Sequence, residues 1–145
     1  MKIALSCDHA GFPFKNPVIT RLQNLWHEVL NLSPETIEPL DDFPDYAAKV
    51  ARAVSDGSAD RGVLICGTGV GMSIAANRHP WIRAVLLYNS EIAKISRSHN
   101  DANIACFGAR TMVIEDVLGF LDIFLSEPFI GGKYEKRNDK IDCLC

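Results

Sequence analysis

Two kinds of hydrophobic pattern alternate along the chain. Short, continuous apolar runs typical of buried strands occur at residues 2–7, 27–32, 62–66, 82–88 and 103–108. Between them, apolar residues return every three or four positions, which predicts helices at residues 13–25, 43–56, 71–77, 90–99, 113–126 and 133–144. Ser90 is the expected N-cap of the helix at 90–99. Strands that alternate with helices indicate βαβ units, and largely continuous apolar runs indicate strands that are covered on both faces.

This alternation predicts the fold class. We expect one Rossmann-like α/β domain over residues 1–145, with three α/β/α layers, about five parallel strands in the order 2-1-3-4-5 and a last helix after about residue 133. The stretch at 31–45 contains three prolines and reads as a loop within this domain. Ligands of open α/β sheets bind beyond the carboxyl ends of the strands, where the strand order reverses. The residues that follow the strands are therefore the first candidates for chemistry.

Composition and charge narrow the class of protein. The chain has 145 residues, 48% of them hydrophobic, and a net charge of −3, which suits a folded domain without a general nucleic-acid or membrane surface. No apolar run approaches the roughly 18 residues of a membrane span, and the first apolar stretch is too short for a signal peptide. Acidic residues gather at 35–45 and basic residues at 133–140. Each cluster fits a solvated surface, and the basic one also fits a small anionic ligand.

The cysteines indicate a reducing compartment. The chain has five, without disulfide or zinc spacing: Cys7, Cys66, Cys106, Cys143 and Cys145. We therefore expect free thiols in a cytoplasmic protein. The terminal C-x-C pair fits a frayed tail better than a metal site.

A glycine loop, GTGVG, follows the third predicted strand at residues 67–71. It is not a dinucleotide fingerprint, which needs glycine where the chain has Met72, and it lacks the Lys-Ser/Thr ending of a phosphate P-loop. A cysteine phosphatase needs an arginine six residues after its cysteine, and that position is again Met72. What remains is a run of backbone amides at the start of a helix, which can hold a phosphate or an oxyanion that forms during a reaction.

Polar residues at the strand ends each allow two interpretations. Cys66, at the entrance of the loop, is either a small buried apolar residue or a thiolate favoured by the amides. Asp8 and His9 end the first strand, either as a turn that caps the next helix or as a functional pair. His99 is either a helix-end cap or a functional imidazole. Arg110 fits a salt bridge as well as a phosphate contact.

Six motifs taken together resemble the type B ribose-5-phosphate isomerase family, which also contains galactose-6-phosphate isomerase subunits. They are CDHAGF (7–12), DFPDYA (42–47), GVLICGTGVGMSIAANR (62–78), IRAV (82–85), SRSHNDANIACFGAR (96–110) and GGKYEKR (131–137). They follow the family's order over almost the whole chain. The glycine loop alone would be weak evidence, whereas the combination is specific.

The resemblance implies an activity. The family interconverts aldose and ketose phosphates through an enediolate, without metal or cofactor. The implied reaction is ribose 5-phosphate to ribulose 5-phosphate and back, in the non-oxidative branch of the pentose phosphate pathway. One alternative is a hexose 6-phosphate substrate, such as allose or galactose 6-phosphate. Another is a non-catalytic module that binds a sugar phosphate; it would need neither Cys66 nor His99, and the chain has both.

The resemblance also implies roles at the first and third strand ends. Cys66 would be the base that moves a proton between C2 and C1 of the sugar. Backbone amides of the loop would hold the enediolate oxygen, and Thr68 could add a hydroxyl contact. Asp8 would handle the hydroxyl protons, and His9 would line the substrate. The loop residues concerned are Gly67, Gly69, Val70 and Gly71.

The remaining implied roles lie later in the chain. His99, helped by Asn100, would open the sugar ring, and Arg110 and Arg137 would bind the phosphate. The family forms homodimers or tetramers, in which His99, Asn100 and the arginines of one subunit face the cysteine of its partner.

Two positions in the chain bear on these implied roles. Where the family usually has Arg-His after the double glycine, this chain has Lys133-Tyr134, which keeps a charge for the phosphate but loses bidentate geometry. Members without the cysteine use a glutamate at the position of Met72, so this chain falls in the cysteine-using group.

Overall fold

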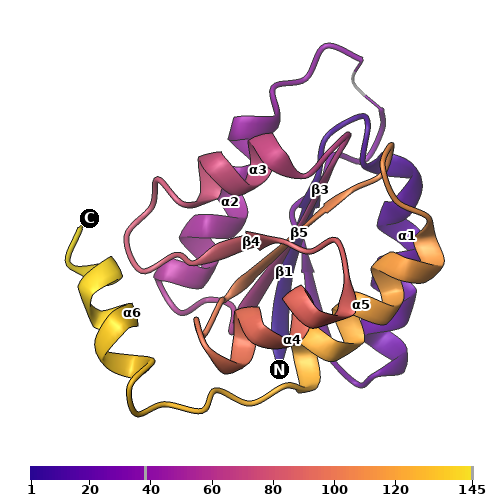
Figure 1. The fold of residues 1–145 in the computed structure, drawn as a ribbon. Helices are drawn as coiled ribbons and strands as arrows, with labels where there is room; N and C mark the ends of the chain where they lie inside the picture. Colours follow the sequence, from indigo (N-terminus) through magenta and orange to yellow (C-terminus); the bar gives the residue numbers. More distant parts are fainter. Residues whose placement is uncertain (38, 145) are drawn as a thin grey trace.

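Five parallel strands form one sheet in the computed structural model, which describes residues 1–37 and 39–144 (Figure 1). The strands are β1 (Lys2–Cys7), β2 (Glu28–Asn31), β3 (Arg61–Cys66), β4 (Ala84–Leu86) and β5 (Ile104–Gly108). The helices are α1 (Phe12–Asn24), α2 (Phe43–Ser55), α3 (Val70–Ala76), α4 (Ser90–Ser98), α5 (Ile114–Ser126) and α6 (Glu135–Asp142).

Helices cover both faces of the sheet and bury two separate cores. Apolar residues of α1, α4 and α5 pack on one face, and those of α2 and α3 pack on the other. Alternate residues of β3 supply the two cores: Val63 and Ile65 face the first, Leu64 and Cys66 the second. The predicted three-layer α/β/α fold is confirmed. Helix α6 lies outside these layers, at the lower left of Figure 1.

The predicted order of the last two strands is wrong. The observed order is β2-β1-β3-β5-β4, so β5 lies next to β3, and β4 is at the edge. Burial explains the exchange. All five residues of β5 are buried, as a central strand requires, whereas two of the three residues of β4 are only half-buried. The neighbouring positions of β1 and β3 are as predicted.

Helix α4 begins with a different cap from the one predicted. Asn89, not Ser90, is the N-cap, and its side-chain oxygen accepts the Ile92 N–H at 2.8 Å. Asparagine and serine are equally good N-caps, so the sequence alone did not separate these neighbours.

The structure describes four of the five cysteines. Cys7, Cys66, Cys106 and Cys143 are free, and Cys145 lies outside the described residues. Within the described ranges, no helix combines the length and apolar character needed to cross a bilayer.

Trp26 ends helix α1 in a conformation that favours glycine. Its φ is +61°, and the residue is 93% exposed. The Trp26 N–H donates to Gln23 O at 2.9 Å, and the His27 N–H donates to Leu22 O at 3.0 Å. This pair of bonds is the Schellman motif, whose left-handed position is usually glycine.

We therefore expect Trp26→Gly to raise the free energy of unfolding by about 1 kcal/mol, because it removes the left-handed strain and loses little buried surface. Urea denaturation followed by circular dichroism measures the change. Trp26→Ala is the matched control, since it removes the indole but keeps a Cβ at positive φ. Equal stability of the two variants would show that the backbone strain is not the cause.

Candidate functional site

Cys66 and the glycine loop form a continuous turn between β3 and α3. Cys66 is the last residue of β3 and is 5% exposed. Its Sγ accepts the Gly69 N–H at 3.1 Å. Thr68 is exposed, and its hydroxyl oxygen accepts the Val70 N–H at 3.3 Å. The turn therefore directs a backbone amide at the thiol sulfur.

Close contacts require glycine in this turn. A Cβ on Gly69, whose φ is +79°, would lie 2.5 Å from Leu86 Cδ1 and 2.9 Å from the Phe107 carbonyl carbon. A Cβ on Gly71 would lie 2.8 Å from the Phe43 ring. The turn is thus enclosed between the ends of β4 and β5 and the start of α2.

Backbone hydrogen bonds join this turn to the segment after β5. The Ala109 N–H donates to Cys66 O at 2.8 Å, and the Arg110 N–H donates to Gly67 O at 2.9 Å. The Arg110 side chain passes beside Gly67, where a Cβ would lie 3.3 Å from its Cδ. Arg110 and Thr68 also line a cleft of about 520 Å³ that extends toward α5. A guanidinium therefore lies beside the loop of the same chain.

Asp8 and His9 lie at the same edge of the sheet, because β1 pairs with β3. The Asp8 N–H donates to Ile65 O at 3.3 Å, and the buried Asp8 carboxylate accepts the Gly11 N–H at 2.9 Å. Asp8 thus shapes the turn before α1. His9 is half-buried, and its Nδ1 lies 2.6 Å from Asp41 Oδ1.

The three residues Asp8, His9 and Asp41 have ligand atoms within 4.8 Å of one another, a spacing that a metal ion could accept. The 2.6 Å contact between His9 Nδ1 and Asp41 Oδ1 is, however, a hydrogen-bond geometry that already uses this ring nitrogen. Asp41 was not among the predicted site residues.

Two further buried thiols differ from Cys66 in their surroundings. Burial raises the pKa of Cys7 to about 11. Burial, and after it the neighbouring Cys66, also raises the pKa of Cys106. Neither group is a thiolate near neutral pH, and neither belongs to the glycine loop.

His99 lies in a different place, between α4 and α6. Its ring stacks on Tyr134, with centroids 4.1 Å apart and an angle of 8° between the planes. The Asn138 side-chain amide donates to His99 O at 3.3 Å. The cations of Lys133 and Arg137 lie 5.1 and 5.9 Å from the Tyr134 ring centroid. Tyr134 and Asn138, which were not predicted as site residues, therefore hold the histidine and the basic cluster together.

Ion pairs fix the turn that follows His99. Arg83 donates to both carboxylate oxygens of Asp142 in α6 at 2.9 Å and to Asp101 at 3.1 Å. Arg97, which is buried, also pairs with Asp101, at 2.7 Å. Asn100 is exposed between these anchored neighbours.

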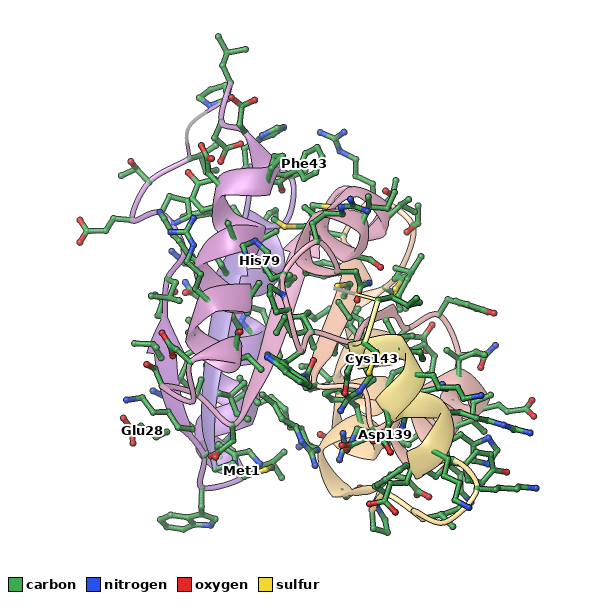
Figure 2. All side chains as sticks on the ribbon, turned by 90° about the vertical axis from the view of Figure 1, so that its left-hand side faces the viewer. Met1, Glu28, Phe43, His79, Asp139 and Cys143 are labelled. Atoms are coloured by element: carbon green, nitrogen blue, oxygen red, sulfur yellow. The ribbon has the colours of Figure 1, made fainter. Side chains whose placement is uncertain are left out.

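The structure therefore divides the predicted site residues into two groups. Cys66 pairs with Gly108 at the carboxyl end of β5, whereas the Gly62 N–H at the amino end of β3 bonds Asn103 O, just after the His99 turn. In Figure 2 the carboxyl ends of the strands point toward the top, near Phe43, and their amino ends point toward the bottom, near Met1 and Glu28. We call the groups the loop half-site (Asp8, His9, Cys66, Gly67, Thr68, Gly69, Val70, Gly71 and Arg110) and the histidine half-site (His99, Asn100, Lys133 and Arg137). Arg110, expected to face the partner's cysteine together with His99, lies beside the glycine loop of its own chain, apart from His99.

Comparison with known proteins identifies the family of this chain. A family model described as Ribose/Galactose Isomerase matches residues 3–141. The chain belongs to the ribose/galactose isomerase family. Within this family it is 41% identical over 143 residues to ribose-5-phosphate isomerase B of Escherichia coli, covering 99% of this chain and 95% of that protein. The predicted family membership is confirmed.

Solved structures of ribose-5-phosphate isomerase B agree with this assignment. The Clostridium thermocellum protein superposes with a TM-score of 0.96 at 41% identity, covering 99% of this chain and 97% of that one. The Mycoplasma genitalium protein, solved with bound ribulose-5-phosphate, gives 0.95 at 35% identity, covering 99% and 95%.

Gly69→Ala should destabilise the protein by about 3 kcal/mol, because a Cβ there adds a clash with backbone atoms of β5 to the cost of a positive φ. Gly57→Ala is the matched control: its φ is +78°, and nothing lies within 4 Å of the place that its Cβ would take. That control should lose only about 1 kcal/mol in the same urea titration. Equal losses would mean that the loop does not depend on the close approach to β5.

Proposed function

We propose that this protein interconverts ribose 5-phosphate and ribulose 5-phosphate, with Cys66 as the base. The observation that carries the proposal is the Gly69 N–H directed at Cys66 Sγ, 3.1 Å away, at the mouth of a loop made of backbone amides. The thiolate takes the proton from C2 of the open-chain aldose and returns it at C1. The amides of Gly67 to Gly71 stabilise the enediolate oxygen between these steps.

Other groups of the loop half-site handle the hydroxyls. The buried Asp8 carboxylate shuttles the proton between the O1 and O2 oxygens as the carbonyl moves along the sugar. Thr68 supplies a hydroxyl beside the loop, and His9 binds a sugar hydroxyl. These assignments fit the position of all three residues at the carboxyl edge, next to Cys66.

The complete site requires a second copy of the chain. Ring opening by His99, with Asn100, must occur on the sugar that Cys66 deprotonates. Within one chain, however, the loop half-site lies at the carboxyl ends of the strands and the histidine half-site lies at their amino ends. A homodimer with a two-fold interface brings the loop half-site of each copy to the histidine half-site of its partner and forms two equal sites. Arg110 then binds the phosphate from one chain, while Lys133 and Arg137 bind it from the other. Lys133 contributes its charge without a bidentate contact.

Cys66→Ala should lower the isomerisation rate by about 10²–10⁴-fold, because it removes the base that moves the carbon-bound proton. The assay follows ribulose formation from ribose 5-phosphate, with a chelator present to test whether a metal is needed. Cys143→Ala, which changes an exposed thiol at the end of α6, is the control and should keep wild-type turnover. Near-normal turnover of Cys66→Ala would refute the assignment of the base.

His99→Asn should slow turnover of ribose 5-phosphate far more than turnover of ribulose 5-phosphate. The aldose is mainly a closed ring, formed by O4 on C1, that must be opened. The ketose has its carbonyl at C2, so a five-membered ring would need the C5 oxygen, and that oxygen carries the phosphate. Initial rates must be taken at short times with a trap for the open-chain aldose. Equal losses in both directions would assign His99 to another step.

A further inference from the structure

Asp41 holds His9 through contacts to two nitrogens, the ring Nδ1 and the backbone N–H, which is shared between both carboxylate oxygens. Its side chain is only 5% exposed. One carboxylate oxygen lies 2.6 Å from His9 Nδ1, and the other accepts the backbone N–H of His9 at 3.0 Å. A buried carboxylate is costly unless donors satisfy it, and here both donors belong to a single residue. Binding of a sugar hydroxyl by His9 does not by itself account for this arrangement.

The loop that carries Asp41 begins at a fixed position on the sheet. The Leu32 N–H donates to Leu5 O at 2.8 Å, and the Ser6 hydroxyl donates to Leu32 O at 3.1 Å. Further along, the buried Lys15 ammonium donates to Pro34 O at 2.9 Å. These bonds fix residues 32–34 beside β1 and α1, and farther along the chain Asp41 contacts His9.

The contact determines where the imidazole carries its proton. An ionised carboxylate only accepts hydrogen bonds, so the Nδ1 atom facing it must carry the hydrogen. In the neutral ring the other nitrogen, Nε2, is then an acceptor. The ring is 32% exposed, so a ligand can reach it.

We propose that Asp41 is a positioning residue that fixes His9 in the Nδ1–H form, so that Nε2 accepts a hydrogen bond from a sugar hydroxyl. The proposal rests on the sugar-phosphate isomerase function above. It adds that Asp41, through His9, makes the substrate present a hydrogen-bond donor to His9 Nε2. Asp41 acts only through His9 and does not itself touch the sugar.

Asp41→Asn separates this role from simple anchoring of the loop. An asparagine has one acceptor oxygen for two donors. When that oxygen keeps the backbone N–H of His9, the amide NH₂ faces Nδ1 as a donor. The ring then places its hydrogen on Nε2 and can no longer accept from the sugar. Anchoring of the loop alone would leave the tautomer unchanged.

The test measures the ring and the rate separately. Nitrogen-15 NMR of histidine-labelled protein at pH 8 distinguishes the two tautomers, and His9→Ala identifies the His9 signals among the four histidines. We expect the Nδ1–H form in the wild type and the Nε2–H form in Asp41→Asn. We also expect kcat/KM for ribose 5-phosphate to fall about tenfold in Asp41→Asn and no further in His9→Ala/Asp41→Asn than in His9→Ala. Asp45→Asn, the same change at an exposed carboxylate in the first turn of α2, should change neither.

Any other form of the His9 ring in the wild type overturns the proposal, and this measurement needs no variant of Asp41 to fold. An unchanged tautomer in Asp41→Asn, or a loss in the double variant equal to the product of the two single losses, also overturns it. If the wild type does not isomerise ribose 5-phosphate, the proposed function fails, and the NMR measurement still decides whether Asp41 sets the ring.

Discussion

The close approach of the glycine loop to the end of β5 is the constraint on which the carboxyl edge depends. Gly69 lies so near the Phe107 carbonyl that no side chain fits, and the Ala109 and Arg110 amides bond the Cys66 and Gly67 carbonyls. Pairing of β3 with β5, rather than with β4, creates this contact. It fixes the thiol, the amides and a guanidinium relative to one another before any ligand binds, as electrostatic stabilisation of an enediolate requires.

The same parallel pairing separates the two half-sites. β5 ends beside the glycine loop, and it begins just after the His99 turn, which α6 and the Arg83 and Arg97 ion pairs hold at the opposite edge. Because β5 is straight, a group at its amino end cannot also lie beside a group at its carboxyl end. Under the proposed function, a complete site needs a second chain, and the two-fold arrangement that we propose supplies each loop half-site with a histidine half-site.

The sequence predicted the layers, the five strands and the common position of the loop residues at the strand ends, because these depend on local periodicity and on the neighbouring positions of β1 and β3. It failed where contacts join distant segments. The order of β4 and β5 follows from their relative burial, and Asp41 was hidden in an acidic stretch that resembles a solvated surface. Tyr134 looked like a departure from the family pattern, and only the structure shows that it stacks on His99.

The most direct test of the two-chain site is complementation between two inactive variants. Cys66→Ala and His99→Ala proteins are unfolded together, refolded as a mixture and assayed with ribose 5-phosphate. Random pairing makes about half of the dimers mixed, and each mixed dimer has one intact site, so about a quarter of wild-type activity should return. If mixed dimers form and no activity returns, each site lies within one chain and the account is wrong.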